Sequence, residues 1–137
     1  MLMKHLKKLP TKFVTCILFF SALPSFASNC KNAITQREMN ACASSALDRE
    51  TKKINSVYGD LRAKLDEKQK SKLKEIQLAW IKFRDLKCKF TASGVEGGSA
   101  YPMVRDACLA EMTQQRIKEL SRFLNCEEGD LSCPVTR

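Results

Sequence analysis

Six cysteines in the last 110 residues of this 137-residue chain constrain its fold more than any other feature. They are Cys30, Cys42, Cys88, Cys108, Cys126 and Cys133. A domain of this size has a modest apolar core, and an even number of cysteines in a small secreted chain is typical of a disulfide framework. The spacing contains no CxxC pair of the kind that structural zinc sites use. We therefore expect all six cysteines to be oxidised, with no bound metal and no cofactor.

The first 27 residues have the layout of a secretory signal peptide. Four lysines and no acidic residue precede an apolar run over residues 13–20. This run is too short to span a bilayer of about 30 Å, and the small residues Ser25 and Ala27 suit a signal peptidase. We expect cleavage after Ala27 and a periplasmic or secreted protein with one mature domain over residues 28–137.

The composition of the mature chain excludes several classes of enzyme. The single histidine, His5, lies in the signal, so neither a Ser-His-Asp triad nor a Cys-His nucleophile can form. Twenty basic and fifteen acidic side chains give residues 28–137 a net charge of +5, and the charges are interleaved along the sequence. We expect no nucleic-acid partner, because an exported chain rarely meets one.

Apolar residues at three- and four-residue spacing predict three helices and no strand. The first helix begins after Thr35, which forms a capping box with Glu38, and runs to about residue 65. The polar residues 66–70 are expected to form the turn, and a second helix then runs to about residue 90. Residues 91–100 contain three glycines and cannot remain helical.

The third helix has Pro102 in its first turn and continues to about residue 125. The predicted fold is therefore all-α, a small antiparallel helical hairpin with a third helix packed against it. Disulfides staple this single domain, whose core covers residues 30–124, and residues 125–137 form an irregular tail.

Six cysteines allow fifteen pairings, and the sequence alone does not choose among them. Cys126 and Cys133 lie close together in the tail and can close a local loop. If the first two helices fold back near residue 67, Cys42, Cys88 and Cys108 all lie toward the far end. Cys30 in the lead-in segment could then reach Cys88, which would leave Cys42 for Cys108.

The second helix carries the largest side chains that we expect in the core. Trp80 and Phe83 give its apolar face most of its bulk, and Arg84 lies beside that face. A functional interpretation would make Arg84 and Asp85 a binding pair, or Asp85 a catalytic carboxylate. We favour a structural role for Arg84, in which its stem packs and its guanidinium pairs with a carboxylate of the first helix, such as Asp48.

The glycine-rich connection is a candidate surface for binding a partner. Gly94, Gly97 and Gly98 would let the backbone approach another molecule closely, Glu96 is the only charged residue of the segment, and Ser99 follows. Loops on a rigid scaffold often carry recognition, but any sharp connection between two helices needs the same residues. Both interpretations remain open. No Gly-Lys-Ser/Thr follows the glycines, so the segment is not a P-loop.

The order of the motifs resembles a known family. The shared residues are Glu38-Met39-Asn40-Ala41-Cys42-Ala43, Gln77…Trp80…Phe83-Arg84-Asp85…Cys88, Gly97-Gly98-Ser99 and Cys108-Leu109…Thr113…Arg116…Leu120. This pattern, over about residues 30–124, is similar to the small exported bacterial proteins known as DUF1311, or the lysozyme inhibitor LprI N-terminal domain. The resemblance implies an all-helical, disulfide-bonded domain of the cell envelope and, for some members, inhibition of lysozyme. Asn29 before Cys30 does not fit a lipobox, so no lipid anchor is expected.

We therefore hypothesise an exported, non-enzymatic binding protein that inhibits lysozyme or a related peptidoglycan hydrolase. Common lysozymes are basic, so long-range charge would not steer this chain toward them, and inhibition would depend on local insertion of Glu96 with the glycines around it. The alternative is an envelope-associated structural or stress-related binding module without inhibitory activity, because a basic domain can lie against the anionic cell envelope. A hydrolase ranks third, because the mature chain has no histidine and the sequence indicates no cleft that could hold the two carboxylates of glycosidic chemistry.

Overall fold

The computed structural model describes residues 30–135 and contains three long helices. They are α1 (Gln36–Ala63), α2 (Glu67–Thr91) and α3 (Tyr101–Leu124), and short 3₁₀ turns, η1 (Cys30–Asn32) and η2 (Ser93–Val95), precede α1 and follow α2. No strand occurs within residues 30–135. The predicted all-α class is confirmed. The signal peptide predicted for residues 1–27 lies outside the described residues.

Capping boxes fix where the first two helices begin. The Thr35 hydroxyl accepts a hydrogen bond from the backbone N–H of Glu38 (3.2 Å), and the Glu38 carboxylate accepts one from the backbone N–H of Thr35 (2.9 Å), as predicted. Asp66 and Gln69 form a second capping box at the start of α2. The prediction that residues 66–70 form the turn was therefore wrong. Because the Asp66 carboxylate accepts from the Gln69 N–H (2.8 Å), the helix starts immediately after Asp66.

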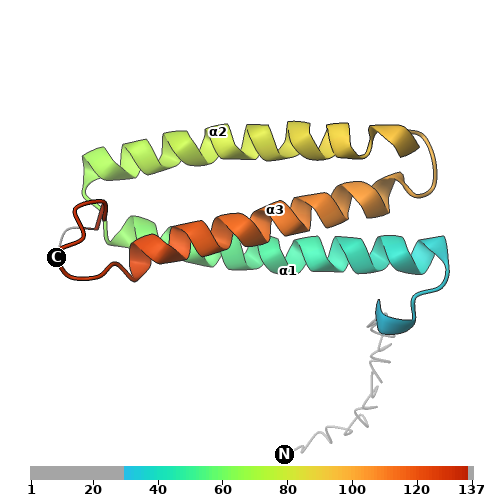
Figure 1. Ribbon diagram of the computed structural model, residues 1–137, viewed down its shortest axis with the longest axis horizontal. Helices are drawn as coiled ribbons and strands as arrows, with labels where there is room; N and C mark the ends of the chain where they lie inside the picture. The colour runs from blue at the N-terminus through green and yellow to red at the C-terminus, as the bar shows by residue number, and fades with distance from the viewer. Residues whose placement is uncertain (1–29, 136–137) are drawn as a thin grey trace, which may run out of the picture.

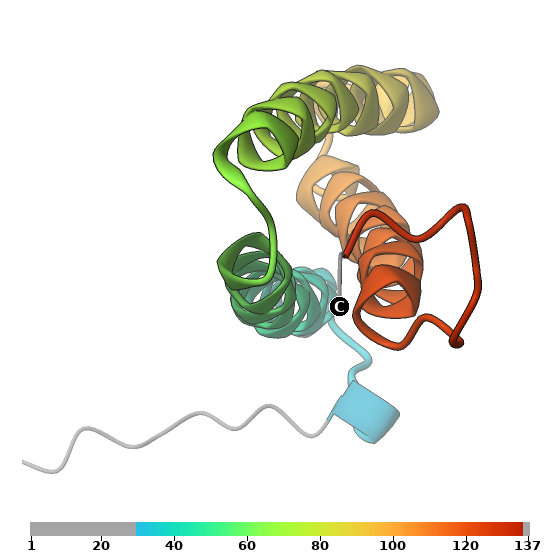
Figure 2. The same ribbon diagram turned by 90° about the vertical axis from the view of Figure 1, so that its left-hand side faces the viewer.

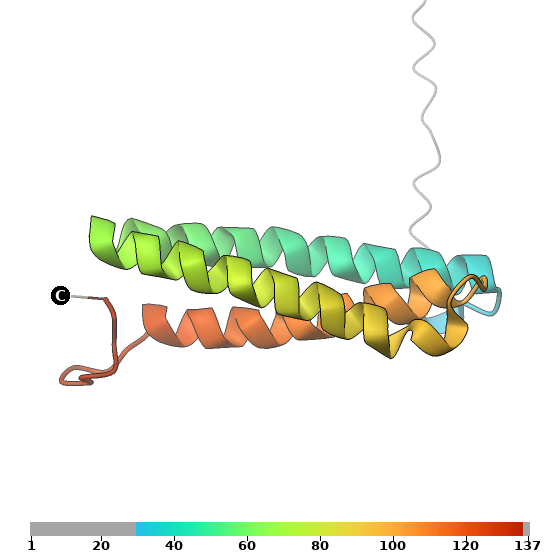
Figure 3. The ribbon, with the colours of Figure 1, turned by 90° about the horizontal axis from the view of Figure 1, so that it is seen from above.

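The helices pack as a close pair with a third helix laid across it. α1 and α3 run in the same direction and pack along much of their length, whereas α2 runs antiparallel to both and leans mainly on α3 (Figure 1, Figure 2). Seen from above, α2 passes over the α1–α3 pair (Figure 3). The predicted hairpin of α1 and α2 is present, but α3 rather than α1 provides most of the contact surface for α2.

The core lies toward the end of the bundle where α1 turns into α2. It consists of Ile54, Leu61 and Leu65 from the first helix and its turn, Leu73 from α2, and Ile117 and Leu120 from α3. Trp80 is half-buried and packs against this cluster, as predicted. Phe83 was also expected in the core, and this was wrong, because 59% of its surface is exposed. α2 turns the arc of Leu73, Trp80 and Cys88 inward, and Phe83 lies outside that arc.

All six cysteines within the described residues form disulfides, three in total. Cys126–Cys133 is confirmed, but the structure pairs Cys30 with Cys42 and Cys88 with Cys108, so the predicted Cys30–Cys88 and Cys42–Cys108 bonds were wrong. The lead-in folds back beside α1, which brings the Cα atoms of Cys30 and Cys42 to 5.6 Å. Cys88 near the end of α2 then faces Cys108 near the start of α3, at 5.5 Å. Both bonds therefore close short local loops.

The lengths and sequences of the helices show whether any of them could span a membrane. None of the helices within residues 30–135 contains an apolar stretch long enough to cross a bilayer.

Candidate functional site

The connection between α2 and α3 lies at the end of the bundle where α1 begins (Figure 1). It comprises residues 92–100, which we term the loop end. Every residue that the sequence singled out for binding lies on it and is exposed: Gly94, Glu96, Gly97, Gly98 and Ser99. The structure therefore brings these residues together on one accessible surface.

The loop end is a succession of tight turns. The backbone N–H of Val95 donates to the Ala92 carbonyl (3.1 Å), and the N–H of Gly98 donates to the Val95 carbonyl (3.0 Å). Gly97 has a φ of 77°, in the left-handed region that favours glycine, although a Cβ there would meet open space. Position 97 therefore favours glycine because of its backbone conformation. A side chain there would have enough space.

Side chains of α1 attach the loop end to the rest of the bundle. The side-chain amide of Asn40 donates a hydrogen bond to the backbone carbonyl of Ser99 (3.0 Å), and Asn40 Oδ1 in turn accepts one from Gln36 Nε2 (2.9 Å). The Cys88–Cys108 disulfide closes the same connection from the other side. Sequence reasoning missed the role of Asn40, which was visible only as one member of the motif over residues 38–43.

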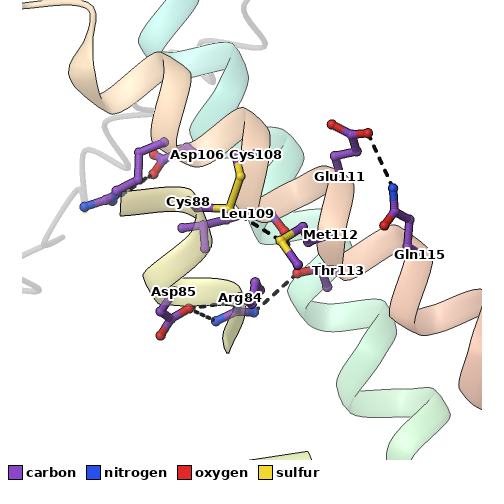
Figure 4. Close-up of a disulfide and its surroundings, with 11 residues drawn as sticks. Arg84, Asp85, Cys88, Asp106, Cys108, Leu109, Glu111, Met112, Thr113 and Gln115 are labelled. Atoms are coloured by element: carbon purple, nitrogen blue, oxygen red, sulfur yellow. Dashed lines mark hydrogen bonds and ion pairs between the residues drawn. A yellow bond between two sulfur atoms is a disulfide. The ribbon is translucent and has the colours of Figure 1, made fainter. Parts of the chain in front are cut away.

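Arg84 contacts α3, but it does not pair with the predicted partner. Its guanidinium pairs with Asp85 of the same helix (2.8 Å) and donates to the Thr113 hydroxyl of α3 (3.3 Å), as Figure 4 shows. Asp48 is exposed on α1 and takes no part in this contact. The predicted Arg84–Asp48 pair was wrong because α2 presents Arg84 to α3 rather than to α1.

Two guanidinium groups lie against the ring of Trp80. The Cζ atom of Arg84 is 5.1 Å from the centroid of the ring, and that of Arg116, from α3, is 5.8 Å away. Arg116 is only 6% exposed, and it donates to Gln77 Oε1 (3.2 Å) and pairs with Glu119 (2.7 Å). The contacts of Arg116 with Trp80 and Gln77 join α3 to α2.

A group of metal-ligating side chains or a cavity elsewhere on the molecule would be a second candidate site. Within the part of the chain that the structure describes, no three His, Cys, Asp or Glu side chains gather where they could hold a metal ion. A cavity of about 220 Å³ lies at the opposite end of the bundle, between α1, α2 and the tail. Its lining is mainly apolar and includes Leu65, Leu73 and Pro134.

Comparisons with known proteins give a family match and a similar protein. A family model described as "Lysozyme inhibitor LprI" matches residues 27–120, which include the loop end and the contacts of Trp80 but not the Cys126–Cys133 disulfide. The chain is also similar to an uncharacterised protein of Rhizobium meliloti (strain 1021), with 29% identity over 114 residues that cover 74% of this chain and 82% of the relative. No solved structure matches the chain.

Proposed function

The chain belongs to the LprI lysozyme inhibitor family, and from this premise we propose that it is an exported binding protein that inhibits lysozyme or a related peptidoglycan hydrolase. Three disulfides are typical of a protein that folds in an oxidising compartment. We accordingly place the protein in the periplasm or outside the cell, after cleavage of the signal at Ala27. It acts by occupying an enzyme and carries out no reaction of its own.

The loop end is the surface that we assign to the enzyme. The observation that carries this assignment is an exposed carboxylate, Glu96, on a loop of tight turns that Asn40 and the Cys88–Cys108 disulfide hold in place. A segment that is already ordered loses less conformational entropy when it binds, so more of its contact energy appears as affinity. Binding residues are accordingly often found on loops that a rigid scaffold positions.

The chemistry of the loop end suits a cleft that binds sugars. Such a cleft contains hydrogen-bond donors that bind sugar hydroxyls, and the Glu96 carboxylate can accept hydrogen bonds from them. Gly97 and Gly98 have no side chains, so the backbone next to Glu96 can follow it into a narrow space. The target is then a hydrolase whose substrate groove is deep enough to admit a single loop.

Charge affects how fast the complex forms. The mature chain carries a net charge of +5, so a basic lysozyme is repelled at long range and its association is slow at low ionic strength. Added salt shortens the Debye length to about 10 Å at 0.1 M and screens this repulsion. We therefore expect inhibition to improve as salt rises over this range.

The test is a lysis assay on a peptidoglycan suspension. The purified domain, residues 28–137, should slow the fall in turbidity that lysozyme produces, and Glu96→Gln should raise the concentration needed for half inhibition about tenfold or more, as expected for a charge-assisted contact at a desolvated centre. The matched control is Glu128→Gln, which removes an exposed carboxylate of the tail, outside the family match. Both variants should keep the wild-type melting temperature.

Two results would contradict the proposal. If an excess of the domain leaves several types of lysozyme fully active, the chain is not an inhibitor of these enzymes. If the domain inhibits but Glu96→Gln and Glu128→Gln behave alike, inhibition does not depend on the loop end.

A further inference from the structure

α2 exposes an apolar stripe beside the face that packs against α3. Of the seven large apolar side chains that are exposed within residues 30–135, five lie on this helix. Phe83 is 59% exposed and Phe90 is 80% exposed. The stripe, at alternating spacings of three and four residues, consists of Ile76, Ala79, Phe83, Leu86 and Phe90. It extends over about 21 Å of helix, given a rise of 1.5 Å per residue.

This stripe is distinct from the face that holds the fold together. The residues turned toward α3 include Leu73, Trp80 and Cys88, and the two arcs are centred roughly 110° apart on a helix with 3.6 residues per turn. α2 therefore has one face that packs and a second, more apolar face on which Phe83, Leu86 and Phe90 are 59–80% exposed. Ile76, at the start of the stripe, also lines the cavity next to Leu61 and Phe123.

The positive charge of the protein collects on the same helix. α2 carries eight basic and three acidic side chains, a net charge of +5. The other described residues carry eleven basic and twelve acidic side chains, a net charge of −1. Charges that look interleaved along the sequence are thus concentrated on one element of the structure.

Lysines of α2 lie on both sides of the stripe, so they would face any surface into which the stripe inserts. On a helical projection, Lys87 borders the stripe on one side and Lys82 and Lys89 border it on the other. All three are exposed. Glu75 is the only acidic side chain within this sector.

The apolar stripe and the positive charge of α2 together indicate which kind of partner the helix would bind. A second copy of the chain would bring two α2 helices, each with a net charge of +5, into contact, and their mutual repulsion opposes such a dimer. Peptidoglycan has no apolar phase that would receive two phenylalanines. An anionic bilayer supplies both the negative charge and the hydrocarbon boundary in which an amphipathic helix buries its apolar face.

We propose that α2 docks the protein on anionic phospholipid surfaces. The helix lies in the plane of the interface, with Phe83 and Phe90 buried among the acyl chains and the lysines on the phosphates. The bundle stays folded, because the side chains that enter the membrane are not those that contact α3. Docking would hold the loop end close to the membrane without any covalent lipid.

Vesicle co-sedimentation tests this directly. The domain over residues 28–137 is used, because the basic and apolar segment before it would bind lipid by itself. It should bind vesicles of phosphatidylglycerol and phosphatidylethanolamine at least tenfold more tightly than vesicles of phosphatidylcholine, and salt should weaken the binding. The double variant Phe83→Ser, Phe90→Ser should lower the affinity at least tenfold.

Matched variants distinguish the effect of the stripe from the effect of losing any exposed apolar side chain or any lysine. Ile34→Ser with Leu131→Ser removes two exposed apolar side chains elsewhere and should leave vesicle binding unchanged. Lys82→Gln with Lys89→Gln should weaken binding about fivefold per lysine, whereas Lys52→Gln with Lys53→Gln, on α1, should not. Melting temperatures should be the same for all of these proteins.

Three results would overturn the proposal. Equal binding to neutral and anionic vesicles would show that the lysines do not contribute to binding. Unchanged binding by the phenylalanine double variant would show that the stripe does not contribute. A dimer in lipid-free solution that the same double variant abolishes would show that a second copy covers the stripe. Since no enzyme is present in these measurements, their outcome is independent of whether the chain inhibits lysozyme.

Discussion

Asn40 in α1 donates a 3.0 Å hydrogen bond from its side-chain amide to the backbone carbonyl of Ser99, 59 residues further along the chain. This contact ties the beginning of α1 to the loop end. Because the Ser99 carbonyl belongs to the backbone, Asn40 fixes the path of the loop whatever side chains the loop carries. The position of Glu96 therefore depends on a residue of a different helix.

Asn40→Ala should loosen the loop end at a modest cost in stability. The loss of one hydrogen bond costs about 1 kcal/mol, and the backbone amides of Gly98 and Tyr101 should exchange with deuterium faster than in the wild type. Asn55→Ala is the control, since it replaces an exposed asparagine of the same helix. Identical exchange in the two variants would mean that the Asn40–Ser99 bond does not order the loop.

Gly97→Ala should strain the turn that carries Glu96. A residue with a Cβ pays about 1–2 kcal/mol in the left-handed region, and Gly97 has a φ of 77°. Gly94→Ala provides the comparison, because Gly94 does not have a positive φ and a Cβ there meets open space. Denaturant unfolding should separate the two variants, and only Gly97→Ala should weaken inhibition of lysozyme.

Trp80→Ala should destabilise the bundle far more than Phe83→Ala. Trp80 packs against the core and against two guanidinium groups, so its removal should cost about 3 kcal/mol. Phe83 is mostly exposed, so its removal should change the free energy of unfolding by no more than about 0.5 kcal/mol. Urea denaturation of the two variants measures the difference, and equal losses would place Phe83 in the core after all.

Peptide mapping without reduction should recover the bonds Cys30–Cys42, Cys88–Cys108 and Cys126–Cys133 and find no free thiol among these residues. Replacing Cys88 and Cys108 together by serine should cost about 3 kcal/mol, because the bond closes a loop of intermediate length in the unfolded chain. Replacing Cys126 and Cys133 should cost less, since they are only seven positions apart in the sequence. The reverse order would show that the tail disulfide supports the core.

The capping carboxylate of Glu38 should make the free energy of unfolding depend on pH in the acidic range. The backbone N–H of Thr35 and then that of Ile34 donate to this carboxylate, and together with the Thr35 hydroxyl they hold its pKa below the ordinary value of 4.5. A lowered pKa in the folded state gives stability that is complete above pH 4.5 and is lost as the pH falls through the folded pKa.

Glu38→Gln preserves a side chain that can cap the helix but does not titrate. Its free energy of unfolding should therefore fall less steeply below pH 4.5 than that of the wild type. Glu75→Gln removes one exposed carboxylate from α2 and serves as the comparison. Parallel pH profiles for wild type and Glu38→Gln would refute a contribution of the capping box to the acid response.

The sequence predicted the helices well because the signals for them are local. The Thr35–Glu38 capping box, the three glycines of residues 91–100 and Pro102 each act within about one turn of the chain, and the structure has helix ends at or next to all of them. The one error of this kind, at residues 66–70, came from treating polar residues as a turn when Asp66 and Gln69 formed a second cap. The pattern that resembles the LprI family was likewise readable, because it consists of residue types at fixed spacing.

Tertiary structure alone decided which face of α2 is buried and which cysteines pair. Phe83 and Trp80 are adjacent on a helical projection, and no local signal indicates that the helix turns toward α3, where Arg84 meets Thr113 and Arg116 meets Trp80. Likewise, the pairing of Cys30 with Cys42 depends on the path of the lead-in beside α1. A helix forms from interactions within a few residues, whereas the orientation of its faces depends on which partner buries the most surface, and that partner is distant in sequence. The exposed apolar stripe and the concentration of charge on α2 follow from that choice.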